Sequence, residues 1–285
     1  KHGITFSKPG NGVCHQLQLE NFAKPGKTLV GSDSHTPTCG AMGMIAIGAG
    51  GLDVAVAMAT GTYYLQCPSV VKVNLVGKKA KWASAKDVIL YILQQLSVKG
   101  GVNKIIEYTG EGLKELSLTD RATICNMGAE LGATTSVFPT DEITKEYLIQ
   151  QGREEDYVEL KADEDATYDE EITVDLSKLV PLTAKPHSPD AVVPVSELRG
   201  MKINQVVIGS CTNSSLPDML KAAKILKGRR VATHVSLVIA PGSSSILAML
   251  SKCGALADMI ASGARILECG CGPCIGMGQA PLSKG

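Results

Sequence analysis

The feature that most constrains the fold is an alternation of short apolar strands and helices in the last third of the chain. The pattern predicts strands at 205–208, 235–239 and 265–267, with helices at 218–226 and 244–260 between them. This alternation is typical of a parallel sheet, whose functional groups gather at the carboxyl ends of its strands. A polar or cysteine-containing motif follows each strand, and we expect the three motifs to meet at one edge. These motifs are 209–213, 241–243 and 268–274.

The earlier part of the chain also mixes strands and helices. Apolar or alternating stretches predict strands at 28–33, 69–76 and 134–138, and helices at 52–61, 85–96 and 117–131. Ser84 is suited to cap the helix at 85–96. The acidic run 152–171 is expected to be solvated surface, and a proline-containing extended stretch, 179–194, follows it. The sequence therefore predicts an α/β protein with a domain boundary near residue 195.

Cysteines dominate the last of the strand-end motifs. Cys271 and Cys274 form a C-x-x-C pair, and the parallel sheet would bring Cys211 to the same edge. Three cysteines could hold three irons of a cubane cluster and leave the fourth iron open as a Lewis acid. Cys269 could instead complete a four-cysteine zinc site, and unliganded buried thiols are a third alternative. The remaining cysteines lack partners at ligand spacing and are expected to be buried packing residues: Cys14, Cys39, Cys67, Cys125 and Cys253.

A second group of polar residues follows the strand expected at 28–33. Asp33 and His35 are two positions apart, so they would share one face of an extended chain. Asn126 and Glu130 are four apart on the helix expected at 117–131 and would share its face. These residues, with His15 as a weaker candidate, predict acid–base and hydrogen-bonding groups for a polar substrate. The alternative for either histidine is a structural role in a turn.

Composition narrows the classes of partner. The chain of 285 residues has 28 basic and 28 acidic residues, and only 4% of its residues are aromatic. A neutral chain with few aromatic residues is poorly suited to binding nucleic acid. No apolar run reaches the roughly 20 residues of a membrane span, and no signal peptide is visible at the start. We therefore expect a soluble intracellular protein without nucleic-acid or membrane partners.

Four segments in order resemble the aconitase family: 30–37, 122–130 with 138–139, 209–215 and 271–276. The resemblance covers nearly the whole chain. It implies three-layer α/β/α domains with mostly parallel sheets, namely the end of a first domain at 1–75, a second at 76–195 and a third at 196–285. It implies a [4Fe-4S] cluster on Cys211, Cys271 and Cys274, and catalytic roles for His15, Asp33, His35 and Glu130, paired His15 with Asp33 and His35 with Glu130. Contacts with the substrate or with its supporting residues are implied for Asp33, Ser34 and His35, and Asn126 is a substrate-binding candidate from its position on the helix face.

The implied reaction is the reversible dehydration that interconverts citrate and isocitrate through cis-aconitate, a small tricarboxylic substrate. The family also has an N-terminal segment and a C-terminal swivelling domain that no part of this sequence resembles, so we expect both as partners and expect this segment alone to be inactive. The large subunits of 3-isopropylmalate dehydratase and homoaconitase are rival assignments. An RNA-binding or zinc-stabilised module is the alternative of another class. The expected location is the cytoplasm, or the mitochondrial matrix in a eukaryote.

Overall fold

The computed structural model describes residues 3–272 and residue 274. Its contacts define two compact units, unit 1 (Lys1–Gln18 with Gly200–Gly285) and unit 2 (Leu19–Arg199). Unit 2 contains most of the two domains expected at 1–75 and 76–195, and it ends close to the expected boundary. The division into three domains stays a prediction.

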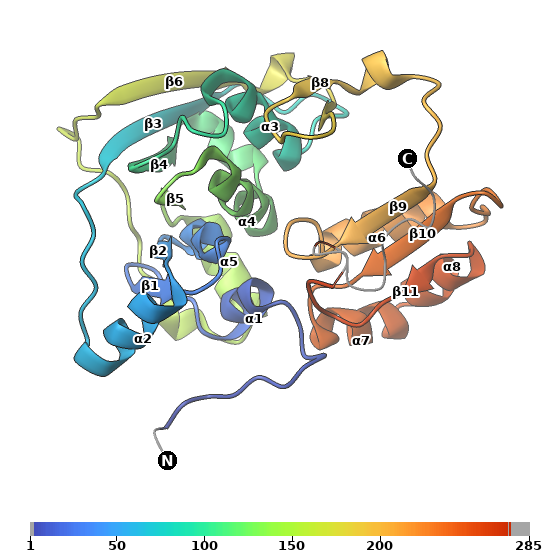
Figure 1. The fold of residues 1–285 in the computed structure, drawn as a ribbon, viewed down its shortest axis with the longest axis horizontal. Coiled ribbons are helices and arrows are strands. Elements are labelled where there is room, and N and C mark those ends of the chain that lie inside the picture. Colours follow the sequence, from blue (N-terminus) through green and yellow to red (C-terminus); the bar gives the residue numbers. More distant parts are fainter. Residues whose placement is uncertain (1–2, 273, 275–285) are drawn as a thin grey trace. The chain divides into compact units, whose positions relative to one another are not determined.

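Unit 2 is built on a four-stranded parallel sheet in the order β5-β4-β3-β6 (Figure 1). Its strands are β3 (Ser69–Val76), β4 (Lys104–Thr109), β5 (Thr135–Val137) and β6 (Glu170–Asp175). A parallel pair, β1 (Thr28–Gly31) and β2 (Ile45–Gly48), and an antiparallel pair, β7 (Leu182–Ala184) and β8 (Val192–Pro194), complete the strands of this unit. The expected α/β class with mostly parallel sheets is confirmed.

Helices of unit 2 connect and cover these strands. The α-helices are α1 (Cys14–Asn21), which begins in unit 1, α2 (Gly51–Thr60), α3 (Ala85–Leu96), α4 (Leu118–Met127) and α5 (Glu142–Gln150). The 3-10 helices are η1 (Thr36–Met42), η2 (Glu111–Glu115), η3 (Gly128–Leu131), η4 (Glu154–Asp156), η5 (Leu176–Lys178) and η6 (Val195–Leu198). Ser84 caps α3 as predicted, because the Ser84 N–H and Oγ–H both donate to the Asp87 carboxylate.

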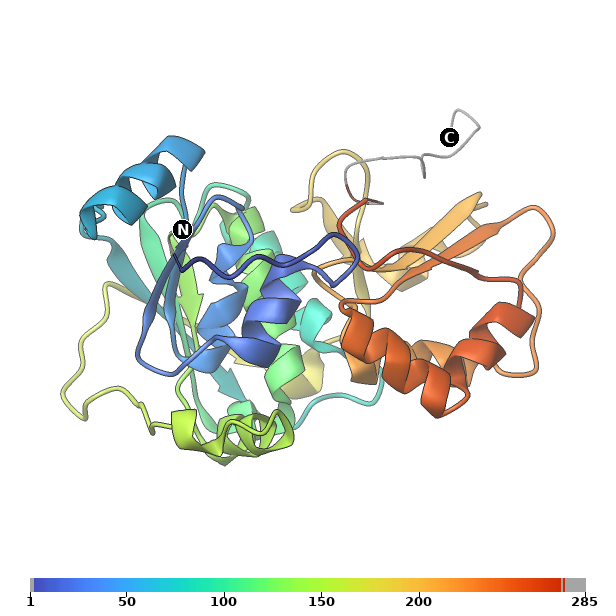
Figure 2. The same cartoon turned by 90° about the horizontal axis from the view of Figure 1, so that it is seen from below.

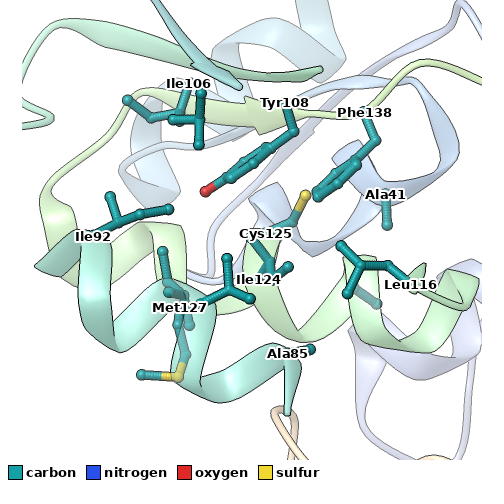
Figure 3. Packing of buried hydrophobic residues seen from close by; sticks show 14 of the residues in the cluster. Ala41, Ala85, Ile92, Ile106, Tyr108, Leu116, Ile124, Cys125, Met127 and Phe138 are labelled. Atoms are coloured by element: carbon teal, nitrogen blue, oxygen red, sulfur yellow. The ribbon is translucent and has the colours of Figure 1, made fainter. Parts of the chain in front are cut away.

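The core of unit 2 lies between the four-stranded sheet and α3 and α4. Tyr108 and Phe138 stack with ring centroids 4.4 Å apart, and the Cys125 thiol on α4 points toward these rings (Figure 3). Arg121, fully buried on the same helix, donates to both carboxylate oxygens of Asp141 at 3.0 and 2.6 Å. This two-point ion pair fixes α4 against the start of α5, because a buried guanidinium needs a partner to offset its lost hydration.

Close backbone packing holds η1 against β5. Phe138 N–H donates to the Gly40 carbonyl at 3.0 Å. A Cβ added at Gly40 would lie 1.7 Å from the Ser136 carbonyl oxygen, so only glycine allows this approach. All seven residues of η1 are buried. The position of the residues just before η1 is therefore set by the core.

Unit 1 contains a three-stranded parallel sheet in the order β11-β10-β9. Its elements are β9 (Gln205–Gly209), α6 (Leu216–Leu226), β10 (Ser236–Ala240), α7 (Ser244–Lys252), α8 (Ala255–Ala261) and β11 (Arg265–Ile266). The view in Figure 2 shows α7 and α8 on one face of this sheet, and α6 packs with them there around a core that includes Met219, Leu250 and Met259.

The prediction of a single helix at 244–260 is wrong, because two helices occupy this range. Gly254, with φ at +81°, adopts the left-handed conformation after Cys253 and separates α7 from α8. The two helices meet at a bend of 86°. No single helix in the described part of the chain is long and apolar enough to cross a membrane, and only α7 and α8 taken together reach that length and apolar composition.

The Gly40 contact yields a stability prediction. We expect Gly40→Ala to lower the free energy of unfolding by about 3 kcal/mol or more, because its Cβ would overlap a backbone oxygen that cannot rotate away. Gly51→Ala is the matched control, since no atom of the described residues lies within 4 Å of a Cβ added at this helical position. Denaturant unfolding of both variants measures the difference, and equal stability of the two would contradict the packing described for η1.

Candidate functional site

The candidate residues fall in both units. Asp33, Ser34, His35, Asn126 and Glu130 lie in unit 2, whereas His15 and the three candidate ligand cysteines lie in unit 1. Each group is described within its own unit. The expected pairing of His15 with Asp33 joins the two units and stays a prediction.

A tight turn at the end of β1 presents Asp33, Ser34 and His35. The His35 N–H donates to Asp33 Oδ1 at 2.8 Å, and Thr36 Oγ1 donates to the Asp33 carbonyl at 2.7 Å. The extended geometry expected for Asp33 and His35 is therefore wrong, because β1 already ends at Gly31. The turn still brings the two side chains together, through an aspartate that bonds the backbone two residues on.

The His35 imidazole has acceptors at both ring nitrogens. Nε2 lies 3.3 Å from Glu130 Oε1, and Nδ1 lies 3.1 Å from Ser34 Oγ and 3.6 Å from Asp33 Oδ1. The hydrogen bond with Glu130 raises the pKa of His35, and this outweighs the lowering by partial burial. The same bond lowers the pKa of Glu130. The pair therefore favours a charged imidazolium beside a carboxylate, in a partly exposed site.

Asn126 lies behind this pair, although the sequence predicted a shared helix face with Glu130. The last residue of α4 is Met127, and Glu130 belongs to the 3-10 helix η3 that follows. Asn126 is fully buried and donates from Nδ2 to Thr38 Oγ1 at 2.9 Å. Its contact therefore supports the turn from inside the protein. Thr38 was not predicted as a site residue, although threonine side chains in turns commonly form hydrogen bonds with nearby backbone groups.

A cavity of about 450 Å³ opens beside the turn within unit 2. Ser34 lines it, and Ala129, next to Glu130 in the chain, lines it too. The other polar side chains around it are uncharged: Tyr63, Gln66, Asn103 and Thr134. Few convergent polar groups in a concave pocket are typical of a small-molecule site.

In unit 1, the segment before α1 is fastened to the carboxyl end of β10. Val13 N–H donates to the Gly242 carbonyl at 2.8 Å, and Gly242 N–H donates to the Ser214 carbonyl at 3.1 Å. His15, two residues after Val13, is 4% exposed. These bonds fix the start of α1, with His15, close to the loop that carries Cys211.

The candidate ligand cysteines follow β9 and β11, the two strands that flank β10. Cys211 comes two residues after the end of β9, and Cys274 Sγ donates to Ser210 Oγ at 2.7 Å. Cys271 and Cys274 are joined by a bond of 3.1 Å from the Cys274 N–H to the Cys271 carbonyl. Cysteine sulfur is a soft donor, so these residues suit an iron–sulfur cluster in donor type.

The described part of the chain contains no three His, Cys, Asp or Glu side chains placed closely enough to hold one metal ion. Residues 273, 275 and 276 of the cysteine motif lie outside that part. The ligand set therefore stays a prediction. Cys269, which the zinc alternative requires, is buried.

The expectation that five other cysteines are buried is correct for two of them. Cys39 and Cys125 are fully buried. Cys14, Cys67 and Cys253 are exposed, so the expectation is wrong for them. Cys14 begins α1, Cys67 lies in the irregular segment before β3, and Cys253 follows α7, and none of these positions faces a core.

The His35–Glu130 contact predicts a pH dependence. We expect Glu130→Gln to lower the pKa of His35 toward its ordinary value, measured by NMR titration of the imidazole. Because the folded pKa of His35 is raised and that of Glu130 is lowered, the pair stabilises the fold between the two pKa values. That contribution is lost as pH rises through the pKa of His35 or falls through that of Glu130. Glu107→Gln, which alters a carboxylate bonded to Tyr168, is the control and should leave His35 unchanged.

Comparisons with known proteins support one family. The profile of the Aconitase family (aconitate hydratase) matches residues 1–285. The chain is 43% identical over its whole length to 3-isopropylmalate dehydratase large subunit 2 of Archaeoglobus fulgidus, of which it covers 68%. Over 97% of its length it is 44% identical to the mitochondrial aconitate hydratase of Schizosaccharomyces pombe, of which it covers 37%.

A solved structure shares the fold. The crystal structure of aconitase X from Thermococcus kodakaraensis in its holo-form matches with a TM-score of 0.53 and 16% identity, covering 92% of this chain and 61% of that one. The profile match over all residues, together with these identities, shows that the chain belongs to the aconitase family.

Proposed function

We propose that this chain forms the cluster-binding and acid–base part of a hydro-lyase that interconverts citrate and isocitrate through cis-aconitate. The observation that carries the proposal is the His35–Glu130 pair, with Ser34 on the other side of the imidazole, in a chain of the aconitase family. Dehydration of a hydroxy acid needs groups that bind its carboxylates and that hold or move a proton at the departing hydroxyl. His35 and its neighbours provide both.

The roles follow from the bonds in unit 2. When protonated, His35 donates from Nε2 to Glu130, which orients the ring, and from Nδ1 to Ser34 Oγ. Ser34 accepts that bond and is exposed, so its hydroxyl hydrogen is available to a substrate carboxylate. The imidazolium supplies positive charge behind the hydroxyl, which favours an anionic substrate. Asp33 fixes the turn through the His35 N–H.

Cys211, Cys271 and Cys274 are proposed to hold a [4Fe-4S] cluster. When bound, the cluster supplies an iron without a cysteine ligand that acts as a Lewis acid on the substrate hydroxyl. Their placement after β9 and β11 and the contact of Cys274 with Ser210 support the assignment. His15, held near this sheet edge, is proposed as a further acid–base group.

A second substrate class is supported equally well. The 43% identity to a 3-isopropylmalate dehydratase large subunit matches the identity to an aconitate hydratase, so 3-isopropylmalate, or homocitrate by the same chemistry, is the alternative. The remaining groups of the site are proposed to come from an N-terminal segment and a swivelling domain, on the same chain or on a partner subunit. The cellular location stays a prediction.

The cluster ligands can be tested by composition. We expect Cys211→Ala, in the whole protein purified without oxygen, to lose most of its iron and acid-labile sulfide, because one of three thiolate ligands is gone. Cys253→Ala is the matched control, since this exposed cysteine lies at the end of α7. The iron, sulfide and zinc contents of both variants and of the unaltered protein are measured. Unchanged iron in Cys211→Ala, or stoichiometric zinc in the unaltered protein, would contradict the assignment.

Ser34 can be tested by kinetics. We expect Ser34→Ala to raise KM about 10-fold or more, since a hydrogen bond to a charged carboxylate contributes about 1.5–3 kcal/mol. Ser32→Ala, two residues earlier and also exposed, should leave KM unchanged. Assays of the whole protein with citrate, isocitrate, homocitrate and 3-isopropylmalate identify the substrate. Absence of turnover with all four would overturn the proposed function.

A further inference from the structure

The structure fixes His35 through its backbone as well as through its ring. Thr38, on the first turn of η1, donates from Oγ1 to the His35 carbonyl at 2.6 Å, and its N–H donates to the same oxygen at 3.0 Å. The Thr38 oxygen in turn accepts the bond of 2.9 Å from Asn126 Nδ2. One hydroxyl therefore joins the backbone of the catalytic turn to α4.

The same stretch of chain holds His35 at two points. Asn126 lies near the end of α4, and Glu130 lies four residues later on η3, which follows α4 without a break. Asn126 reaches the His35 carbonyl through Thr38, whereas Glu130 bonds the imidazole directly. Because both anchors belong to one continuous segment, the bond at Thr38 helps to set how far the ring lies from its carboxylate.

Burial makes this contact rigid. Thr38 is 2% exposed and Asn126 is 0% exposed. Water cannot readily replace a hydrogen bond at such a position, and a buried group left without its partner costs about 1–3 kcal/mol. Glu130 and His35 are partly exposed and lack comparable packing of their own. The charged pair therefore depends on buried neighbours for its geometry.

We propose that Thr38 is a positioning residue for the reaction, with its hydroxyl held between Asn126 and the His35 carbonyl so that the imidazole stays within reach of Glu130. The effect of Thr38 on the reaction rests on the proposed function. The geometric part concerns only unit 2 and can be measured without turnover. Asn126 is the other member of this buried link, and its amide acts on His35 through Thr38.

The test compares Thr38→Val with Thr38→Ser. Valine keeps the shape of the side chain but removes both hydroxyl bonds, whereas serine keeps them. Among the described residues of unit 2, Glu130 and Asp33 are charged groups that face the ring. We expect Thr38→Val to lower the pKa of His35 in an NMR titration, because the ring moves away from Glu130. Thr38→Ser should retain the raised pKa.

The same variants are then assayed in the whole protein. We expect Thr38→Val to lower kcat by about 10- to 100-fold with a smaller change in KM, as small displacements of a catalytic group do. Thr38→Ser should restore most of kcat. If Thr38→Val does not fold, Thr38→Ala removes the same hydroxyl with less crowding and is held to the same two outcomes.

Two threonines of unit 2 provide controls. Thr144 is fully buried and its Oγ1 has no hydrogen-bond partner among the residues that the structure describes, so Thr144→Val should change neither stability nor the pKa of His35 much. Thr140 Oγ1 donates to the Val158 carbonyl and accepts from the Leu160 N–H. Thr140→Val should therefore destabilise the fold without lowering the pKa of His35, which separates positioning from general loss of stability.

The outcomes distinguish the two proposals. A folded Thr38→Val protein in which the pKa of His35 and kcat are both unchanged would overturn the positioning role and leave the hydro-lyase assignment intact. A lowered pKa in a protein that dehydrates none of the four substrates would support the positioning of His35 and overturn the proposed function. An equal fall of the pKa in Thr140→Val would also overturn the positioning role.

Discussion

The burial of η1 is the constraint on which the site in unit 2 depends. Its seven residues are all buried, and Gly40 contacts the Ser136 carbonyl so closely that no side chain fits. The turn that carries Asp33 and His35 leads directly into this element, so the packing of the core determines where the imidazole lies. A flexible surface loop could present the same residues, but it would lose more conformational entropy each time the charged pair formed.

Two ion pairs of unit 2 show how burial decides what a charge can do. Arg121 is fully buried and bonds Asp141 at two points, so this pair fixes α4 and has no exposed guanidinium surface for a ligand. His35 and Glu130 have side chains that are 27% and 38% exposed, so their charges remain accessible. The hydrogen bond between them raises the pKa of His35 and lowers the pKa of Glu130, so each group favours the charged form of the other. The buried Arg121–Asp141 pair therefore holds two helices together, whereas the accessible His35–Glu130 pair can contact a ligand.

The predicted bounds of β3 and α3 agree with the structure at both ends. The signals for them, an alternation of β-branched residues and a serine cap, depend only on residues close together in the chain. They missed β6, which lies at the end of the acidic run 152–171. Glu170 and Glu171 pair with Lys104 of β4 and Lys72 of β3 at 2.6 and 3.3 Å, contacts between residues far apart in the chain that a run of acidic residues does not reveal. The burial of Asn126 was not predicted either, because it also depends on a residue far away in the chain. Its partner Thr38 is 88 residues away in the chain, and no local pattern reports such a contact.

The loops that carry the candidate residues are positioned in each unit by the same kind of close backbone contact. In unit 1, a Cβ at Gly209 would lie 2.0 Å from the Ala240 carbonyl oxygen, and one at Gly242 would lie 2.5 Å from Ser214 Oγ. Gly209 also adopts a φ of +135°, which side chains disfavour. The chain thus leaves β9 in direct contact with β10, just as η1 contacts β5 through Gly40. Because neither contact tolerates a side chain, each loop has little freedom to shift. Side chains that bind a small substrate need accurate placement, and backbone packing of this kind provides it.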